Sequence, residues 1–142
     1  MWSIIRKKIE GYLKEYGRLL VFAGPVYDFD YDGRRDKVAA DKGSGSKFSD
    51  VFVVLLRCSK KGAGWIEDGT ACVNAEDTRI VSYVLPHVKE DNNCLKEDEY
   101  LHDNVATIRD VERLTGLRFF SNPKKWPEKI ALRLRTTFGT NF

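Results

Sequence analysis

Aspartates at alternate positions place the tightest constraint on how this chain folds. Four carboxylates fall within nine residues, and they would repel one another strongly unless a divalent cation lay among their oxygens. The spacing is that of a calcium loop of the EF-hand type, in which side chains at positions 1, 3, 5 and 9 and a main-chain carbonyl at position 7 bind the ion. The expected Ca²⁺ ligands are Asp28, Asp30, Asp32, the carbonyl of Arg34, and Asp36, with Gly33 at the sharp turn.

The residues around this loop depart from an EF-hand. Position 12, which needs a bidentate Glu, is Ala39. The apolar run 19–23 before the loop is typical of a strand, and residues 37–47 after it are typical of coil, so two flanking helices are not expected. The loop is therefore predicted to be an isolated calcium loop on another scaffold. The alternative is a solvated acidic turn without an ion.

Length and composition indicate one folded domain. The chain has 142 residues, 42% of them hydrophobic, which is enough for a sizeable core. The 24 basic and 21 acidic residues are mixed along the chain, so the net charge of +3 does not by itself require nucleic acid or an anionic membrane as partner. No apolar run approaches the roughly eighteen residues of a membrane span, and no signal-peptide pattern is present.

Hydrophobic periodicity predicts an α+β fold with an antiparallel or mixed sheet of at least three strands and flanking helices. Thr107 and Asp110 form a capping-box pattern at the start of one helix, and Gly116 ends it. Residues 89–103 are predicted to be an acidic loop. The expected helices span 2–16, 110–114 and 128–134, and the expected strands span 18–23, 51–56 and 80–85.

Three cysteines, Cys58, Cys72 and Cys94, lack the spacing of a zinc site. They are compatible with three free thiols. They are equally compatible with one disulfide and one cysteine left over, because a local bridge between Cys58 and Cys72 is geometrically easy.

Catalytic motifs are absent from the sequence. His87 and His102 have no nucleophile or metal ligand at useful spacing, and no phosphate-binding glycine loop or nucleophile elbow is present. The C-terminal third carries basic residues interleaved with aromatic ones. This pattern indicates either a phosphate-binding patch or a solvated face with its aromatic residues in the core. The residues in question are Arg113, Arg118, Lys124, Lys125, Lys129, Arg133 and Arg135, with Phe119, Phe120 and Trp126.

Several segments together resemble the nuclease-like domain at the C-terminal end of ectonucleotide pyrophosphatase/phosphodiesterases, the autotaxin group. The resemblance covers nearly the whole chain, and its most specific parts are the calcium loop and the segment Thr115–Phe120, which is also similar to DNA/RNA non-specific endonucleases of the ββα-metal (His-Me finger) class. The matching segments are Leu20–Gly33, Val53–Leu55, Val81–His87, Asp91–Asn93, Thr107–Phe120 and Ile130–Thr136.

The resemblance implies a partial ββα-metal endonuclease-like fold, with residues 1–142 as the C-terminal half of a nuclease-like domain. The histidine and asparagine of active nucleases, and the threonine and zinc ligands of the phosphodiesterase domain, have no counterpart in this sequence. The implied function is therefore non-catalytic: a Ca²⁺-binding part that supports the phosphodiesterase catalytic domain of a longer parent protein.

The resemblance also implies roles for the cysteines and a location. Cys58 and Cys72 match a local disulfide, and Cys94 matches the cysteine that bridges to the catalytic domain, which favours an extracellular or cell-surface origin.

Two other functions remain open. One is a metal-dependent endonuclease that uses the aspartates, and the other is a module that binds nucleic acid or other phosphate anions through the basic residues.

Overall fold

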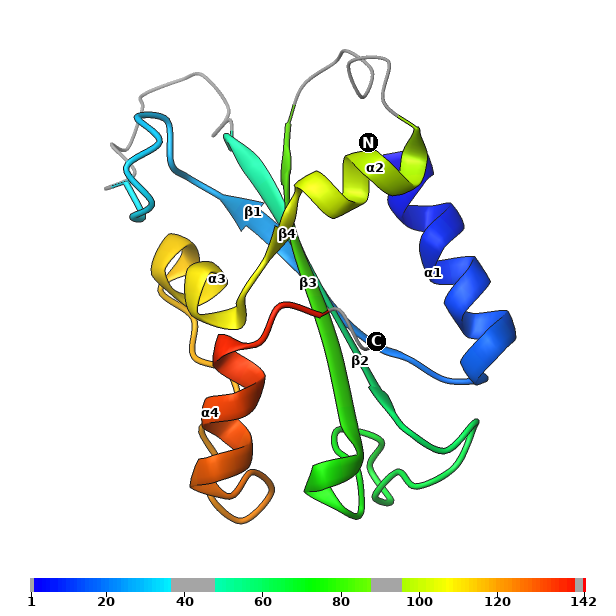
Figure 1. Cartoon of the computed structure of the whole chain (residues 1–142). Coiled ribbons are helices and arrows are strands. Elements are labelled where there is room, and N and C mark those ends of the chain that lie inside the picture. The colour runs from blue at the N-terminus through cyan, green and yellow to red at the C-terminus, as the bar shows by residue number, and fades with distance from the viewer. Residues whose placement is uncertain (1, 37–47, 88–95, 140–141) are drawn as a thin grey trace.

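The computed structural model describes residues 2–36, 48–87, 96–139 and 142. Its centre is a four-stranded antiparallel sheet with the strand order β1-β2-β3-β4 (Figure 1). The strands are β1 (Leu20–Val26), β2 (Asp50–Cys58), β3 (Thr78–Pro86) and β4 (Val105–Ala106). The helices are α1 (Trp2–Tyr16), α2 (Glu97–Asp103), α3 (Ile108–Thr115) and α4 (Glu128–Thr136), with a 3₁₀ turn η1 (Ala75–Asp77). The expected α+β class is confirmed, and the sheet is antiparallel.

Strand β2 is central and fully buried. Val53 pairs with Ala23 of β1 on one side and with Tyr83 of β3 on the other. All nine residues of β2 are buried, as expected for an unbroken apolar run with neighbours on both edges and on both faces. The sequence prediction of a central strand at 51–56 is therefore confirmed.

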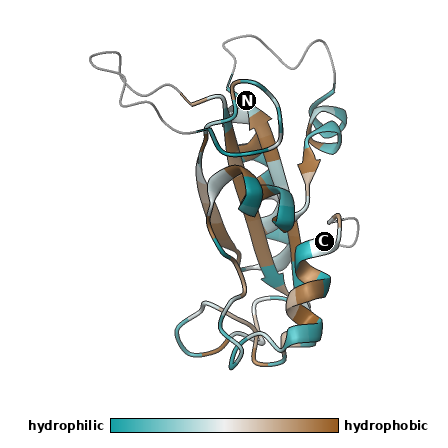
Figure 2. Ribbon diagram, turned by 90° about the vertical axis from the view of Figure 1, so that its left-hand side faces the viewer, coloured by the Kyte–Doolittle hydropathy of each residue, from teal (hydrophilic) through white to brown (hydrophobic). Residues whose placement is uncertain are grey.

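The sheet separates two hydrophobic clusters, each covered by helices. On one face α1 and α2 pack with Ile5, Leu55 and Leu101, and on the other face α3 and α4 pack with Val54 and Val111 (Figure 1). Alternate residues of β2 supply both clusters because successive side chains of a strand point to opposite faces. Hydrophobic residues run along the central strands in Figure 2. The result is a helix–sheet–helix arrangement of three layers.

Strand β1 differs from its prediction in two ways. It continues through Gly24 and Pro25 to Val26 instead of ending before them. It is also an edge strand with Val21 and Phe22 40% and 39% exposed, although its apolar run predicted a buried strand. An edge strand tolerates proline because one side of its backbone needs no partner within the sheet.

The predicted loop at 89–103 is wrong for residues 97–103, which form α2. The main-chain N–H of Lys96 donates to the Glu99 carboxylate at 3.3 Å, which closes the first turn. Tyr100 and Leu101 are buried against the sheet. Because only two residues of this helix are buried, its sequence carries little apolar periodicity, and packing on the core stabilises it.

Helix α3 follows the sequence closely. The Thr107 hydroxyl accepts a hydrogen bond from Asp110 N at 3.1 Å, and the Asp110 carboxylate accepts one from Thr107 N at 3.0 Å. Gly116 ends the helix in the left-handed conformation with φ of 75°. No helix in the described parts of the chain is long and apolar enough to cross a membrane.

Candidate metal site

The aspartate loop, residues 27–36, leaves the end of β1 and folds back on itself beside α3. Its ends are joined by a hydrogen bond from Asp36 N to Tyr27 O at 2.8 Å. The main-chain N–H of Phe29 donates to the Asp36 carboxylate at 2.7 Å. A further bond from Arg35 N to Arg113 O at 3.3 Å ties the loop to α3. The loop is thus closed at its base and held against a helix.

Ser49 fixes the first aspartate to the sheet. Its hydroxyl accepts a hydrogen bond from Asp28 N at 2.8 Å and donates one to Val26 O at 3.0 Å. This role of Ser49 was not predicted from the sequence. No pattern in the sequence marks it, because the contact joins residues 21 positions apart.

Asp28 is the organising carboxylate. It is 6% exposed, and its two oxygens accept hydrogen bonds from Asp32 N and Gly33 N, both at 3.1 Å. These bonds wrap the loop around the Asp28 side chain. Gly33 has φ of 77°, a conformation that glycine adopts without steric strain. The predicted turn at Gly33 is therefore confirmed.

The four predicted aspartates converge. Asp28, Asp30, Asp32 and Asp36 each bring a carboxylate oxygen within 4.8 Å of the others. Burial raises the pKa of Asp28, as do its hydrogen bond with the Asp30 carboxyl and the charge of Asp32, and the N–H donors of Gly33 and Asp32 partly offset this. A cation among these oxygens would relieve the repulsion.

All the side-chain donors of this cluster are hard carboxylate oxygens, so the set fits a hard cation such as Ca²⁺ or Mg²⁺ better than a soft transition metal. Arg34 N donates to the Asp32 carboxylate at 2.8 Å. The role of the Arg34 carbonyl as a ligand stays a prediction. Ala39, the departure at position 12, lies outside the described residues.

A hollow of about 870 Å³ opens between the aspartate loop and α3. Asp28 and Asp32 line it from the loop, and Asp110 and Arg113 line it from the helix. Arg34 and Arg35 also line it, so the hollow carries both acidic and basic side chains. The hollow therefore gives solvent access to one side of the carboxylate cluster.

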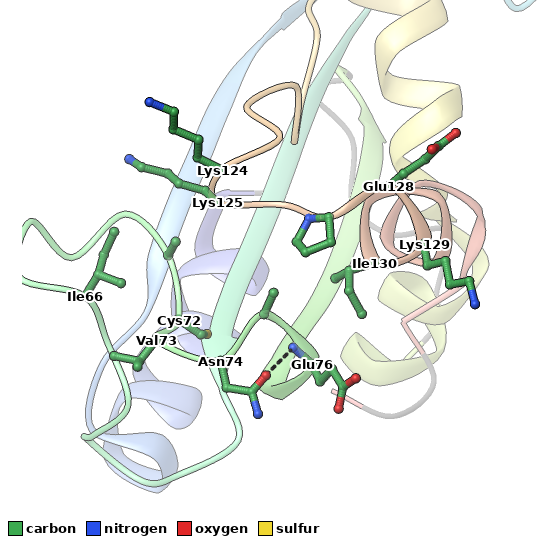
Figure 3. Close-up of a pocket in the computed structure, with 13 residues that line it drawn as sticks. Ile66, Cys72, Val73, Asn74, Glu76, Lys124, Lys125, Glu128, Lys129 and Ile130 are labelled. Carbon is green, nitrogen blue, oxygen red and sulfur yellow. Dashed lines mark hydrogen bonds between the residues drawn. The ribbon is translucent and has the colours of Figure 1, made fainter.

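A second hollow, of about 710 Å³, lies between the loop before β3 and the start of α4 (Figure 3). Lys124, Lys125 and Lys129 line it, but their ammonium groups point away from its centre in Figure 3. Lys125 instead contacts the Thr70 hydroxyl at 2.8 Å. These lysines do not converge on one point, so this hollow does not have the donor arrangement of a phosphate site.

The aromatic residues interleaved with the basic ones belong to the core. Phe119 and Trp126 are buried, and Phe120 packs against Trp126 with ring centroids 4.8 Å apart. Arg135 forms an ion pair with Glu112 at 3.4 Å between α4 and α3. The aromatic residues of this segment therefore lie in the core, as one of the two interpretations expected, and phosphate binding by its basic residues stays a prediction.

A disulfide joins Cys58 at the end of β2 to Cys72, with Cα atoms 5.7 Å apart. It anchors the loop between β2 and β3, where Trp65 and Cys72 also form an isolated β-bridge. The predicted local pairing is therefore present. Cys94, predicted as an outward partner, lies outside the described residues.

Neither histidine belongs to the group of side chains that could bind a metal. His87 is exposed and packs against Phe48 with tilted rings whose centroids are 4.2 Å apart. His102 is exposed in the last turn of α2. Within the described residues, the only group that could hold a metal consists of the four aspartates.

Fold and site together define a disulfide-containing, three-layer α+β domain with a carboxylate loop at the edge of its sheet. No protein-family model matches the chain. Similar proteins are, however, found among the phosphodiesterases. A venom phosphodiesterase of Crotalus durissus collilineatus is 30% identical over 139 residues, which cover 88% of this chain and 16% of the venom protein.

Two further relatives carry the family name itself. An ectonucleotide pyrophosphatase/phosphodiesterase of Caenorhabditis elegans is 26% identical over 140 residues, covering 96% of this chain and 18% of the relative. Ectonucleotide pyrophosphatase/phosphodiesterase family member 1 of Homo sapiens is 29% identical over 156 residues, covering 97% and 15%. The chain is therefore related to the ectonucleotide pyrophosphatase/phosphodiesterases, and it spans about a sixth of the length of these relatives.

Proposed function

We propose that this chain is a calcium-binding, non-catalytic part of a nuclease-like domain of an ectonucleotide pyrophosphatase/phosphodiesterase. Asp28, Asp30, Asp32, the Arg34 carbonyl and Asp36 would bind the ion. The convergence of four carboxylate oxygens within 4.8 Å in a closed, anchored loop carries the proposal. When bound, calcium would offset part of the negative charge of the cluster and hold the loop between β1 and α3.

The ligand types are what favour calcium over magnesium. Several carboxylates with a main-chain carbonyl are typical of calcium loops, whereas Mg²⁺ is usually bound by one or two carboxylates and keeps several waters. The carboxylate oxygens lie within 4.8 Å of one another, a spacing compatible with either ion.

The proposed role is structural support of a phosphodiesterase domain in a longer protein that hydrolyses nucleotide or lysophospholipid phosphodiesters. The extent of the matches supports this role, because the chain corresponds to only about a sixth of each relative. The disulfide Cys58–Cys72 supports an extracellular or cell-surface location, where such bonds persist. Cys94 would provide a covalent link to the catalytic domain.

Thermal melting tests the calcium proposal directly. We expect the wild-type chain to melt at a higher temperature in millimolar Ca²⁺ than in EDTA, because an ion that binds only the folded state stabilises it by about 2.7 kcal/mol at 100 times its Kd. Asp28→Asn should lose this difference. Asp103→Asn, which removes an equal charge from the exposed end of α2, should retain it. Equal melting temperatures with and without Ca²⁺ in the wild-type chain would contradict the proposal.

A metal-dependent endonuclease is the second candidate, and the hollow beside the aspartates is what favours it. Arg34, Arg35 and Arg113 line this hollow next to Asp28 and Asp32, so cationic side chains flank the carboxylates. A plasmid assay tests this candidate: a nuclease would cleave supercoiled plasmid in Mg²⁺, and the Asp28→Asn variant would lose this activity. Cleavage that depends on Asp28 would replace the non-catalytic proposal with this one.

A further inference from the structure

A buried arginine of the sheet lies against Tyr16, the last residue of α1. Arg57 of β2 is 9% exposed, and its Nε atom is buried without a hydrogen-bond partner. Its cross-strand neighbour is Arg79, another cation. A buried guanidinium needs acceptors and a polarisable surrounding, because desolvation of its charge is otherwise costly.

Phe142 supplies both. Its main-chain oxygen accepts hydrogen bonds from Arg57 Nη2 at 2.9 Å and from the Tyr16 hydroxyl at 3.1 Å. Its ring makes T-shaped contacts with two aromatic rings of α1, with centroid distances of 4.8 Å to Tyr12 and 5.9 Å to Tyr16. The Arg57 guanidinium lies 3.8 Å from the centre of the Tyr16 ring and 5.2 Å from that of Phe142.

These contacts involve the C-terminal half of α1, which buries fewer residues in the core than the N-terminal half. The buried residues of α1, Ile4 and Ile5, lie in its first turn. Toward the other end the helix turns Leu13 to solvent, 43% exposed, and relies on partly buried Tyr12 and Tyr16. The second half of α1 therefore depends on aromatic and hydrogen-bonding contacts, many of them made by Phe142.

We propose that Tyr12, Tyr16 and Arg57 form a receptor site for an aromatic residue that presents a main-chain oxygen, and that Phe142 fills this site as a latch holding α1 on the sheet. The T-shaped contacts with Tyr12 and Tyr16 select the ring, and Arg57 with the Tyr16 hydroxyl selects the oxygen beside it. The ligand class is thus an aromatic amino acid within or at the end of a peptide. This site lies on the face of the sheet covered by α1 and α2, so it is independent of the proposed calcium loop.

Hydrogen exchange on the full chain tests the latch. In Phe142→Ala we expect the amides of residues 9–16 to exchange about tenfold faster, because the aromatic contacts are lost, with β2 and β3 unchanged. Tyr16→Phe, which removes only the hydroxyl, should show a smaller increase in the same residues. Leu132→Ala is the matched control, because it also truncates a large apolar side chain, at a site 54% exposed on α4, and should leave α1 unchanged.

Chemical rescue tests the receptor site separately. Added N-acetylphenylalanine should slow the exchange of α1 in Phe142→Ala toward the wild-type rate, and it should not change the wild-type chain, whose site is filled. N-acetylalanine should have no effect on either. Unchanged exchange of α1 in Phe142→Ala, an equal increase throughout the chain, or no rescue by N-acetylphenylalanine would each overturn the proposal. A calcium response would be unaffected by any of these outcomes.

Discussion

Removal of the disulfide should destabilise the chain by an amount that follows from its position. The bond closes a loop between residues 58 and 72, a separation of 14 residues. Closing a loop of about 15 residues lowers the entropy of the unfolded chain enough to contribute roughly 3 kcal/mol. For a domain of this length, this corresponds to a fall in melting temperature of about 10 °C.

The double variant Cys58→Ala/Cys72→Ala isolates this contribution. We expect its free energy of unfolding, from guanidinium titration followed by circular dichroism, to be about 3 kcal/mol below that of the oxidised wild-type chain. Because the two cysteines are 3% and 4% exposed, a mild reductant should open the bond only when the chain unfolds locally. Ca²⁺ must be held constant, since a bound ion also shifts stability.

Val73→Ala provides the matched control. Val73 is adjacent to Cys72 but 72% exposed, so its truncation should change stability by no more than about 0.5 kcal/mol. If the double variant lost less than about 1 kcal/mol, the entropic account of this disulfide would be wrong. Alkylation of the unfolded, unreduced wild-type chain at all three cysteines would show that the bond itself is absent.

Two further predictions concern single residues. Thr107→Ala should lower the free energy of unfolding by about 1 kcal/mol in urea titration, because Asp110 N loses its hydrogen-bond acceptor. Thr107→Ser keeps the hydroxyl and should retain most of the stability. Equal losses in both variants would contradict the capping role. Burial raises the pKa of Asp50 above its ordinary value of 3.8, so the Asp50 carboxyl binds its proton more tightly in the folded state than in the unfolded state. The free energy of unfolding should therefore fall as the pH rises from about 4 through the raised pKa. Asp50→Asn should lessen this fall, and an unchanged pH profile of stability would refute it.

The sequence indicated most of the elements because local rules agree with the fold. The unbroken apolar run 51–56 predicted the central strand, and the Thr107–Asp110 capping box with Gly116 predicted both ends of α3. The alternating aspartates predicted the loop, since the turn at Gly33 and the Asp28 contacts depend on residues a few positions apart. The sequence also carried the family relationship, which the similar phosphodiesterases support.

The failures have one physical cause. β1 and β2 have similar apolar runs, but only β2 has neighbours on both edges, and no local pattern distinguishes an edge strand from a central one. Helix α2 is short and weakly periodic, so its stability comes from Tyr100 and Leu101 packing against the sheet. Both errors concern burial, which depends on residues distant in sequence.

The sequence by itself determined the chemistry of the candidate site: which carboxylates it contains, their spacing, and the cysteines available for pairing. Tertiary structure alone decided how that chemistry is held. Ser49 reaches Asp28 from 21 residues away, and the loop rests on α3 through Arg113. Phe142 reaches Tyr16 across 126 residues. A contact between residues so far apart leaves no periodicity in the sequence, because it forms only when packing of the core brings the two segments together.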